Sequence, residues 1–368
     1  MAKRRARELG LPFDGETGQN NAITDVPGVE VGYATISAGK GPGEEGPCVQ
    51  TGVTAIHPRG RDATPSYVFA GLHALNGNGE MTGAHWIADA GYFCSPICIT
   101  NTHSVGMAHH ATVKWMIDRH PEFFENDHRF VMPVIAETYD GILNDINGLH
   151  VSQSHVYEAL DSARPGPVAE GNVGGGNGMI TYGFKAGSGT SSRTLDIDGA
   201  RFTLGVFVQS NFGKRQDLTI CGVAVGQHMP DAPDLALSSD DEHGSIIAVV
   251  ATDAPLLPSQ LSRVAKRASL GLARTGSFAG NGSGDIFLAF STANAAVDLE
   301  DKVTVHAAQA LDDRHLDHVY KATRDATEEA IINALLAAET SFSVRPKGVA
   351  VPAIDHGRLL DIMNIKSA

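Results

Sequence analysis

The sequence has few cysteines and no long apolar run, and each shortage excludes a class of protein. Its 368 residues include only four cysteines and no C-x-x-C pair, so neither a disulfide framework nor a common cysteine metal site is expected. No apolar stretch approaches the ~20 residues of a membrane-spanning helix, and none follows the basic N-terminus as it would in a secretory signal. We therefore expect a cytoplasmic, reduced protein with no membrane partner.

Basic residues are scarce relative to acidic ones. The chain has 28 Lys and Arg against 42 Asp and Glu, which gives a formal net charge of -14. Binding to nucleic acid needs a basic surface, so no nucleic-acid partner is expected. The 42% of hydrophobic residues and the 41 glycines fit a globular, enzyme-like core.

Familiar catalytic and metal-binding patterns are missing as well. The sequence has no Gly-x-Ser-x-Gly nucleophile elbow and no His-Glu-x-x-His zinc motif. His315 and His318 share a helix face beside two aspartates, but two histidines without a distant third ligand do not complete a tetrahedral site. We interpret them as a solvated helix face and expect no metal and no cofactor.

Short apolar runs alternate with amphipathic segments, which predicts a mixed α/β protein. Strands are expected at 29–36, 53–57, 66–70, 97–100, 131–136, 219–225, 246–251 and 286–290. Helices are expected at 105–119, 154–163, 259–273 and 316–338. Residues 194–208 contain Asp198-Gly199 between two apolar runs, which predicts a hairpin. This mixture favours stacked sheets with helices outside them.

The sequence does contain an abrupt junction at His243-Gly244-Ser245-Ile246, where an acidic segment meets a purely apolar run. A cut before Ser245 would free its α-amino group, which titrates at about pH 7.7 and can act as a base for the serine's own hydroxyl. His243 lies in the acidic linker and is a poor candidate for a fixed base. The same junction also fits an ordinary loop that enters a core strand.

Four other segments are unusually rich in Gly, Asn and hydroxyl residues. They are residues 75–83, 171–178, 209–213 and 279–285. The first is expected to be a sharp turn that opens a helix. The second offers backbone amides that suit an anion, but it lacks the ending of a P-loop and the spacing of a dinucleotide fingerprint, so nucleotide binding is not expected.

The last two of these segments contain candidate catalytic side chains. Asn211 ends a strand of the expected hairpin, where its amide is suited to face a developing oxyanion, although asparagine also ends many strands without such a role. Ser283 and Asp285 stand two residues apart at the entry of a strand, which puts both side chains on one face.

Together and in this order, these segments resemble the family of self-processing N-terminal-serine aminopeptidases, which includes L-aminopeptidase D-Ala-esterase/amidase and the β-peptidyl aminopeptidases. The resemblance extends to residues 21–29, 51–58 and 352–355 and so runs through most of the chain. Residues 11–15 look more like the D-Ala-esterase/amidase branch. Each motif alone is weak, but the ordered set is specific and favours a cleavage site at the junction.

The resemblance implies roles for individual residues. Ser245 is implied as the nucleophile, and the bond between Gly244 and Ser245 as the autocleavage point. Asn211 is implied as an oxyanion donor, with Tyr139 lining the site and helping to hold the tetrahedral intermediate. Glu137 is implied to receive the free ammonium group of the substrate, since a buried carboxylate pairs with a cation and rejects N-blocked peptides.

The same resemblance implies that Ser283 and Asp285 form a hydroxyl and carboxylate relay beside Ser245. Some relatives carry Glu in place of Asp285, so the shorter side chain puts the reach of the relay in question. Asn177 stands where a Thr is expected in the Gly-rich segment, a change that bears on the shape of the pocket.

For the whole chain, the resemblance implies a four-layer α/β/β/α sandwich, like the N-terminal-nucleophile hydrolases and similar to ornithine acetyltransferase. Residues 1–368 would form one domain, cut into fragments 1–244 and 245–368, and cleaved protomers would assemble as homotetramers. The implied activity is release of N-terminal L-, D- or β-amino acids from short peptides, amides or esters through an acyl-enzyme at Ser245.

Two alternatives remain open from the sequence. An autoprocessing acyltransferase like ornithine acetyltransferase would share the fold and the cut, although that family normally uses Thr where this chain has Ser245. A non-enzymatic small-molecule binding protein would use the Gly-rich segments and would stay uncut.

Overall fold

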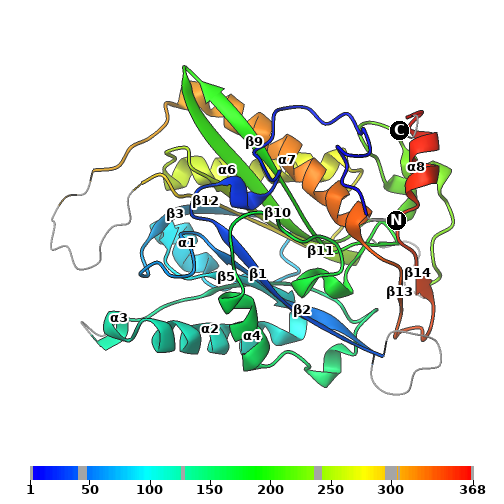
Figure 1. The fold of residues 1–368 in the computed structure, drawn as a ribbon, viewed down its shortest axis with the longest axis horizontal. Helices are drawn as coiled ribbons and strands as arrows, with labels where there is room; N and C mark the ends of the chain where they lie inside the picture. The colour runs from blue at the N-terminus through cyan, green and yellow to red at the C-terminus, as the bar shows by residue number, and fades with distance from the viewer. Residues whose placement is uncertain are drawn as a thin grey trace.

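Two β-sheets lie face to face between two layers of helices (Figure 1). The structure is a computed structural model that describes residues 3–39, 48–125, 129–235, 243–294, 305 and 307–365. The smaller sheet has the order β1 (Glu30–Ala38), β2 (Val49–His57), β5 (Ile97–Asn101), β6 (Val134–Thr138). The larger sheet has the order β4 (Tyr92–Phe93), β3 (Val68–Ala74), β12 (Gly282–Ser291), β11 (His243–Thr252), β10 (Ala200–Asn211), β9 (Ser188–Ile197).

Helices cover the outer face of each sheet. Those packed on the smaller sheet are α2 (Val105–Arg119) and α4 (Gln153–Asp161), and those on the larger sheet are α6 (Pro258–Arg274) and α7 (Leu316–Ala337). Shorter helices are α1 (Ala84–Ala90), α3 (Pro121–Glu125), α5 (Val225–His228) and α8 (His356–Ile362). Two small strand pairs lie outside the sheets, β7 (Ile180–Thr181) with β8 (Phe184–Lys185) and β13 (Ser341–Phe342) with β14 (Ala350–Val351). The predicted four-layer α/β/β/α arrangement is confirmed.

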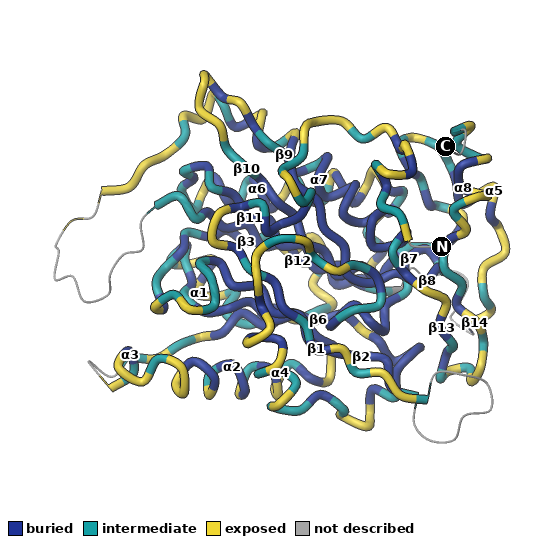
Figure 2. Tube along the Cα trace, in the orientation of Figure 1, coloured by how far each residue is buried: buried dark blue, intermediate teal, exposed yellow. Residues whose placement is uncertain are grey.

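Strand β11 shows why the layers form. Ile247 and Val249 pack into the core between the two sheets, whereas Ile246, Ala248 and Val250 pack into the core under α6 and α7. Successive side chains of a strand point to opposite faces, so a strand covered on both faces reads as a continuous apolar run instead of an alternating one. Strands β2, β5, β6 and β12 are accordingly buried along nearly their whole length, whereas β1 at the sheet edge is more exposed (Figure 2).

The two sides of the Gly244–Ser245 bond are interleaved in the larger sheet. Strand β11 pairs antiparallel with β10 and parallel with β12, and β12 pairs antiparallel with β3. Nearly all of β11 and the whole of β12 follow this bond in sequence, while the strands that flank them precede it. Neither stretch of chain can therefore complete this sheet alone.

Most of the predicted elements are present, but the expected strand at 219–225 is wrong. Cys221 and Gly222 have positive φ angles of 47° and 82°, and the bond from Ile220 N to the Val223 carbonyl is 2.9 Å long. The segment is a tight turn, because the left-handed conformation of two successive residues interrupts an extended strand. Strand β11 also begins earlier than expected, at His243, so Gly244 and Ser245 lie within a strand.

The Gly-rich segment does not form an anion cradle. Gly174–Gly178 is a short, buried 3-10 helix that reaches between the sheets. The amides of Gly174 and Gly175 donate to the hydroxyls of Thr35 and Thr54. A Cβ on Gly176 would lie 2.3 Å from the Ser188 nitrogen, so the glycines are needed for close packing. Asn177 is also buried, and its amide donates to the Ile36 carbonyl, which ties this segment to β1.

Helix α7 exposes His318 near its start, in agreement with the predicted solvated face, and buries several polar side chains farther along. Its Glu329 is fully buried and forms ion pairs with Arg7 at 2.9 Å and with Arg193 at 2.7 Å. Asn21 donates a 2.6 Å hydrogen bond to the same carboxylate. These partners all precede the junction, so the cluster ties α7 to the other stretch of chain. Within the described ranges, no helix has the length and apolar character needed to cross a membrane.

Replacing Glu329 with Gln is expected to lower the free energy of unfolding by about 3–5 kcal/mol, because it leaves the buried guanidinium of Arg193 without its counter-charge. Arg314→Gln is the control, since the Arg314–Asp312 pair is exposed on both sides and its loss should have no measurable effect. Denaturant unfolding of the two variants provides the comparison. An equal effect of both substitutions would contradict a stabilising role for the Glu329 cluster.

Candidate functional site

Ser245 lies near the start of β11, between two neighbouring strands. It is opposite Asn211, the last residue of β10, and in register with Gly284 of β12. Its Oγ accepts a hydrogen bond from the Gly284 amide at 3.2 Å and donates to the Gly244 carbonyl at 2.6 Å. The side chain is buried, with 5% of its residue surface exposed. The hydroxyl therefore adjoins the carbonyl of the peptide bond that precedes it.

Position 244 can be occupied only by glycine. Its φ angle is 145°, and a Cβ at this position would lie 2.1 Å from the Asn211 carbonyl oxygen. Both the backbone conformation and the close approach of β10 exclude larger residues. The expected linker before this glycine is only partly visible, because residues 236–242 and the side chain of His243 lie outside the described residues.

The amide of Asn211 has a defined orientation. Its Oδ1 accepts from the Ile180 amide at 2.9 Å, and its Nδ2 donates to the Tyr139 carbonyl at 2.9 Å. Asn211 and Ser245 are directly opposite each other in an antiparallel pair, so their side chains share the face that looks toward the smaller sheet. The NH2 group is thus held beside the serine, where a donor to an oxyanion is needed.

Ser283 and Asp285 form the pair that the sequence predicted. The Ser283 hydroxyl donates to Asp285 Oδ1 at 2.6 Å, and both side chains are buried. The shorter aspartate therefore reaches its partner. However, alternation along β12 places this pair on the face of Phe287, under the helices, whereas Ser245 faces the other sheet with Ile247. The pair and the Ser245 hydroxyl lie on opposite faces of the larger sheet.

Asn76 holds the carboxylate of Asp285, and sequence reasoning missed this residue. Its Nδ2 lies 3.2 Å from Asp285 Oδ2, 2.9 Å from the Ala279 carbonyl and 3.1 Å from the Gly280 carbonyl. The next asparagine, Asn78, donates only to the Gly282 carbonyl, at 2.7 Å. The Asn and Gly content of this segment indicated a turn, and nothing in it distinguished one asparagine from the other.

Glu137 belongs to β6 of the smaller sheet and is the buried acid of the site, with 3% exposure. Its Oε1 accepts from the Glu80 amide at 3.0 Å, and its Oε2 accepts from the Thr102 hydroxyl. Burial raises the pKa of Glu137 above the usual glutamate value, and these two hydrogen bonds oppose the shift. A carboxylate in this setting favours a cationic partner.

Tyr139 follows β6 and is 45% exposed. Its carbonyl belongs to the site through the bond from Asn211, while its hydroxyl lies against Gly141 of the same turn, 2.3 Å from where a Cβ would stand. The residue after it, Asp140, is buried and receives a 3.0 Å bond from Asn144. Burial raises the pKa of Asp140 to about 7. The turn that carries Tyr139 is therefore held from inside the protein.

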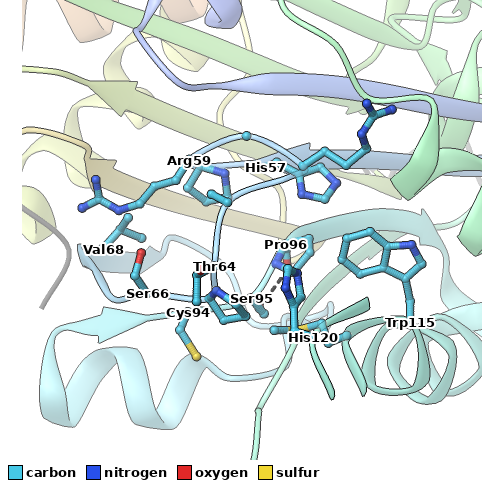
Figure 3. Close-up of a pocket in the computed structure, with 16 residues that line it drawn as sticks. His57, Arg59, Thr64, Ser66, Val68, Cys94, Ser95, Pro96, Trp115 and His120 are labelled. Atoms are coloured by element: carbon cyan, nitrogen blue, oxygen red, sulfur yellow. Dashed lines mark hydrogen bonds between the residues drawn. The ribbon is translucent and has the colours of Figure 1, made fainter. Parts of the chain in front are cut away.

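A cavity lies near the ends of β2 and α2 (Figure 3). It is lined by residues that include His57, Trp115 and His120, and burial lowers the pKa of His57 to about 4. Arg59, also in its wall, bonds to the carbonyl of Thr292, the residue after β12. Thr292 is eight residues from Gly284, or roughly 26 Å at the usual rise per strand residue. The cavity is thus remote from Ser245.

Among the described residues, no group of three or more His, Cys, Asp or Glu side chains is placed to hold a metal ion. His315 instead lies with its Nε2 3.2 Å from Asp198 Oδ2. The four cysteines are all free.

Comparisons with known proteins agree on one family. Residues 21–347 match Peptidase family S58. The chain is 47% identical to beta-peptidyl aminopeptidase BapA of Sphingosinicella microcystinivorans over 372 residues, which cover 98% of this chain and 91% of that protein. It is 43% identical to the protein of the same name from Sphingosinicella xenopeptidilytica, over 100% of this chain and 92% of that one.

Solved structures agree with the sequence comparisons. The L-aminopeptidase D-Ala-esterase/amidase of Ochrobactrum anthropi, described as a prototype for the serine aminopeptidases and a variant of the Ntn hydrolase fold, superimposes with a TM-score of 0.92 at 51% identity, covering 98% of each chain. The beta-aminopeptidase of a Burkholderia species gives a TM-score of 0.88 at 43% identity, covering 98% of each chain.

If Asn76 holds the Asp285 carboxylate in its working position, Asn76→Ala should slow the reaction of Ser245 with a serine-directed acylating reagent by roughly 10- to 100-fold, the cost of a small misplacement in a catalytic group. Asn78→Ala is the matched control, because Asn78 contacts the same loop but only a backbone carbonyl. Its reaction rate should stay within about twofold of the unmodified protein, as for a residue outside the reacting groups. Equal losses in both variants would show that only the loop contact matters.

Proposed function

Because the chain belongs to peptidase family S58, we propose that it is a serine aminopeptidase that releases N-terminal residues from short peptides, amino-acid amides and esters. The observation that carries this proposal is the position of Ser245. Its hydroxyl lies between the Asn211 amide of β10 and the backbone amide of Gly284 in β12, and it contacts the carbonyl of the bond before it. The comparisons favour this function over the acyltransferase and the non-enzymatic binding protein.

The first proposed step is self-cleavage. Ser245 Oγ attacks the Gly244 carbonyl carbon, and the proton of the hydroxyl passes to the Ser245 nitrogen. The bond between this nitrogen and the carbonyl carbon then breaks, so the acyl group moves from the nitrogen to the oxygen of Ser245. Water then hydrolyses this ester, which regenerates the hydroxyl and leaves a carboxylate on Gly244 and a free amine on Ser245. The 2.6 Å contact between the hydroxyl and the Gly244 carbonyl oxygen supports attack without a large backbone movement.

The cleaved protein would then use Ser245 on external substrates. Its oxygen attacks the substrate carbonyl, and the tetrahedral oxyanion is held by Asn211 Nδ2 and by backbone amides, at about 3 kcal/mol for each donor. The acyl-enzyme that follows is opened by water. Asn211 carries two amide hydrogens, of which the Tyr139 carbonyl takes one, so the second is the one assigned to the oxyanion. Tyr139 would line the site next to Asn211 and help to hold the tetrahedral intermediate.

The proposed base is the new α-amino group of Ser245. The Ser283–Asp285 pair lies on the opposite face from the Ser245 hydroxyl, but a backbone nitrogen lies in the plane of the sheet and belongs to neither face. The pair is therefore suited to orient the amine and to stabilise it once it accepts the hydroxyl proton. In this assignment the Ser283–Asp285 pair acts on the Ser245 nitrogen and not directly on the Ser245 hydroxyl.

Glu137 is the proposed acceptor for the ammonium group of the substrate. It lies in the other sheet and is buried, so it would gain a charge-assisted hydrogen bond from a free N-terminus and none from a blocked one. The requirement for a free amine would then follow from one carboxylate.

We further propose that fragments 1–244 and 245–368 stay together as a single αββα unit after the cut. The interleaved strands of the larger sheet and the Glu329 ion pairs support this. Four free cysteines are compatible with a reducing, cytoplasmic setting. Assembly into homotetramers remains a proposal that rests on the family resemblance and would be tested by sedimentation.

Intact-mass measurement tests self-cleavage. The unmodified protein should give two masses, for fragments 1–244 and 245–368, whereas Ser245→Ala should remain a single chain because it has no nucleophile. Ser269→Ala, a serine of α6 in the same fragment, should be cut like the unmodified protein. Two fragments from Ser245→Ala would rule out autocleavage by this residue.

Replacing Glu137 with Gln tests the ammonium site. The kcat/KM for L-alanyl p-nitroanilide should fall roughly 10- to 100-fold, the worth of a hydrogen bond to a charged group. The control is Glu80→Gln, which keeps the backbone amide that bonds to Glu137 and removes only an exposed neighbouring charge, so it should have a much smaller effect. A Glu137→Gln enzyme that keeps its preference for free over N-acetylated substrates would refute the assignment.

The same assignment predicts a pH dependence. The ammonium binds the carboxylate form, and the pKa of Glu137 is raised by burial, so kcat/KM should be lost on acidification at a higher pH than for an exposed glutamate. Glu137→Gln should remove the contribution of this carboxyl group and leave the separate limb of the Ser245 amine, whose ordinary pKa is about 7.7. If the pH profile of kcat/KM were the same in Glu137→Gln, its acidic limb would report the titration of another group.

A further inference from the structure

The proposed nucleophile and the proposed ammonium acceptor belong to different sheets, and one loop joins them. Residues 75–80 leave the end of β3 in the larger sheet and reach the edge of β6 in the smaller one, where the Glu80 amide bonds to Glu137. The preceding residue of this loop, Gly79, packs against Gly284 of β12, whose amide bonds to Ser245 Oγ. The loop thus lies between the residue proposed to bind the substrate ammonium group, Glu137, and the residue proposed to attack its carbonyl, Ser245.

Gly79 is in close contact with Glu137 of the smaller sheet and with Gly284 of the larger sheet. A Cβ at Gly79 would lie 3.3 Å from Glu137 Oε1 and 3.3 Å from the Cα of Gly284. Carbon atoms at van der Waals contact are about 3.5–4.0 Å apart, so a methyl group here would push the carboxylate and β12 apart by a few tenths of an ångström. In the other direction, a Cβ on Gly284 would lie 2.9 Å from the Cα of Gly79. The two backbones can approach this closely because both residues are glycines.

Resting on the proposed function, we infer that Gly79 is the spacer that sets the distance between Glu137 and Ser245, and so determines the length of the N-terminal residue that the site accepts. A substrate must place its ammonium at Glu137 and its carbonyl at Ser245 at the same time. An α-amino acid and a β-amino acid differ in this span by one carbon, about one bond length of 1.5 Å. The distance across Gly79 therefore discriminates between the two classes.

The test compares two amides that differ only in that carbon, L-alanyl and L-β-homoalanyl p-nitroanilide. In Gly79→Ala the added methyl should widen the gap and raise the ratio of kcat/KM for the β substrate to that for the α substrate by about threefold or more, a fraction of what a whole methylene is worth in a fitted pocket. Hydrolysis of p-nitrophenyl acetate, which has no ammonium group, does not use this span and so measures separately any displacement of β12 that reaches Ser245.

The same loop provides a matched control. A Cβ on Gly77 would have no atom within 4 Å, so Gly77→Ala makes the same chemical change without touching Glu137 or Gly284. It should leave both kcat/KM values and the ester activity unchanged. Glu137→Asp is a second, independent test, since it shortens the acceptor by one carbon and should shift the ratio in the same direction as Gly79→Ala.

The outcomes separate this inference from the function on which it rests. If the unmodified enzyme hydrolyses N-acetyl-alanyl p-nitroanilide as fast as the free amine, the proposed function itself fails. If the free-amine preference holds but Gly79→Ala leaves the β to α ratio unchanged, or lowers ester and amide hydrolysis equally, Gly79 is not the spacer. Opposite shifts in Gly79→Ala and Glu137→Asp would overturn it as well.

Discussion

The pairing of β11 between β10 and β12 is the constraint on which the rest of the structure depends. It holds the residue after the proposed cut by hydrogen bonds to strands on both sides, and the apolar run that follows is buried in the two cores above and below the sheet. A peptide bond at the end of such a strand can be broken without releasing the strand, because its position is set by its neighbours rather than by chain connectivity. The same pairing delivers the site, since it places Asn211 opposite Ser245 and Gly284 beside it.

The site joins the two sheets at one end of the sandwich. The larger sheet supplies the serine and its donors, the smaller sheet supplies Glu137, and the loop after β3 closes the distance between them. Catalysis and substrate selection are therefore assigned to different layers. A change in the packing between the layers would alter which substrates fit while leaving the groups around Ser245 in place, which is a different outcome from a change within the larger sheet.

Sequence patterns predicted the elements well where local signals agreed. Helix α2 has the predicted bounds of 105–119, and the hairpin turns at Asp198-Gly199 as expected. The prediction of a strand at 219–225 was wrong because the apolar composition of this segment is typical of a strand. The positive φ angles of Cys221 and Gly222, which make it a turn, are not indicated by that composition. Pattern alone also could not distinguish a Gly-rich anion loop from one that the sheets require for packing, since both need bare backbone.

The site was predictable in its residue types but not in its spatial relations. Ser283 and Asp285 were expected to share a face, which follows from the period of a strand, and they do. Which face they share depends on the register between β11 and β12, and these strands are separated by α6 and its loops. The role of Asn76 depends on a contact more than 200 residues away along the chain, where short-range reasoning has no information.

The opposite placement of the relay and the serine hydroxyl has a chemical consequence. In the uncut chain the Ser245 nitrogen is an amide, which is not basic, so it offers the Ser283–Asp285 pair no proton acceptor at that point. Once the bond is broken the nitrogen becomes an amine of ordinary pKa about 7.7, and the pair gains a partner in the plane of the sheet. Self-cleavage would then do more than expose a nucleophile: it would create the base on which the second reaction depends, so that one buried pair is idle before the cut and engaged after it.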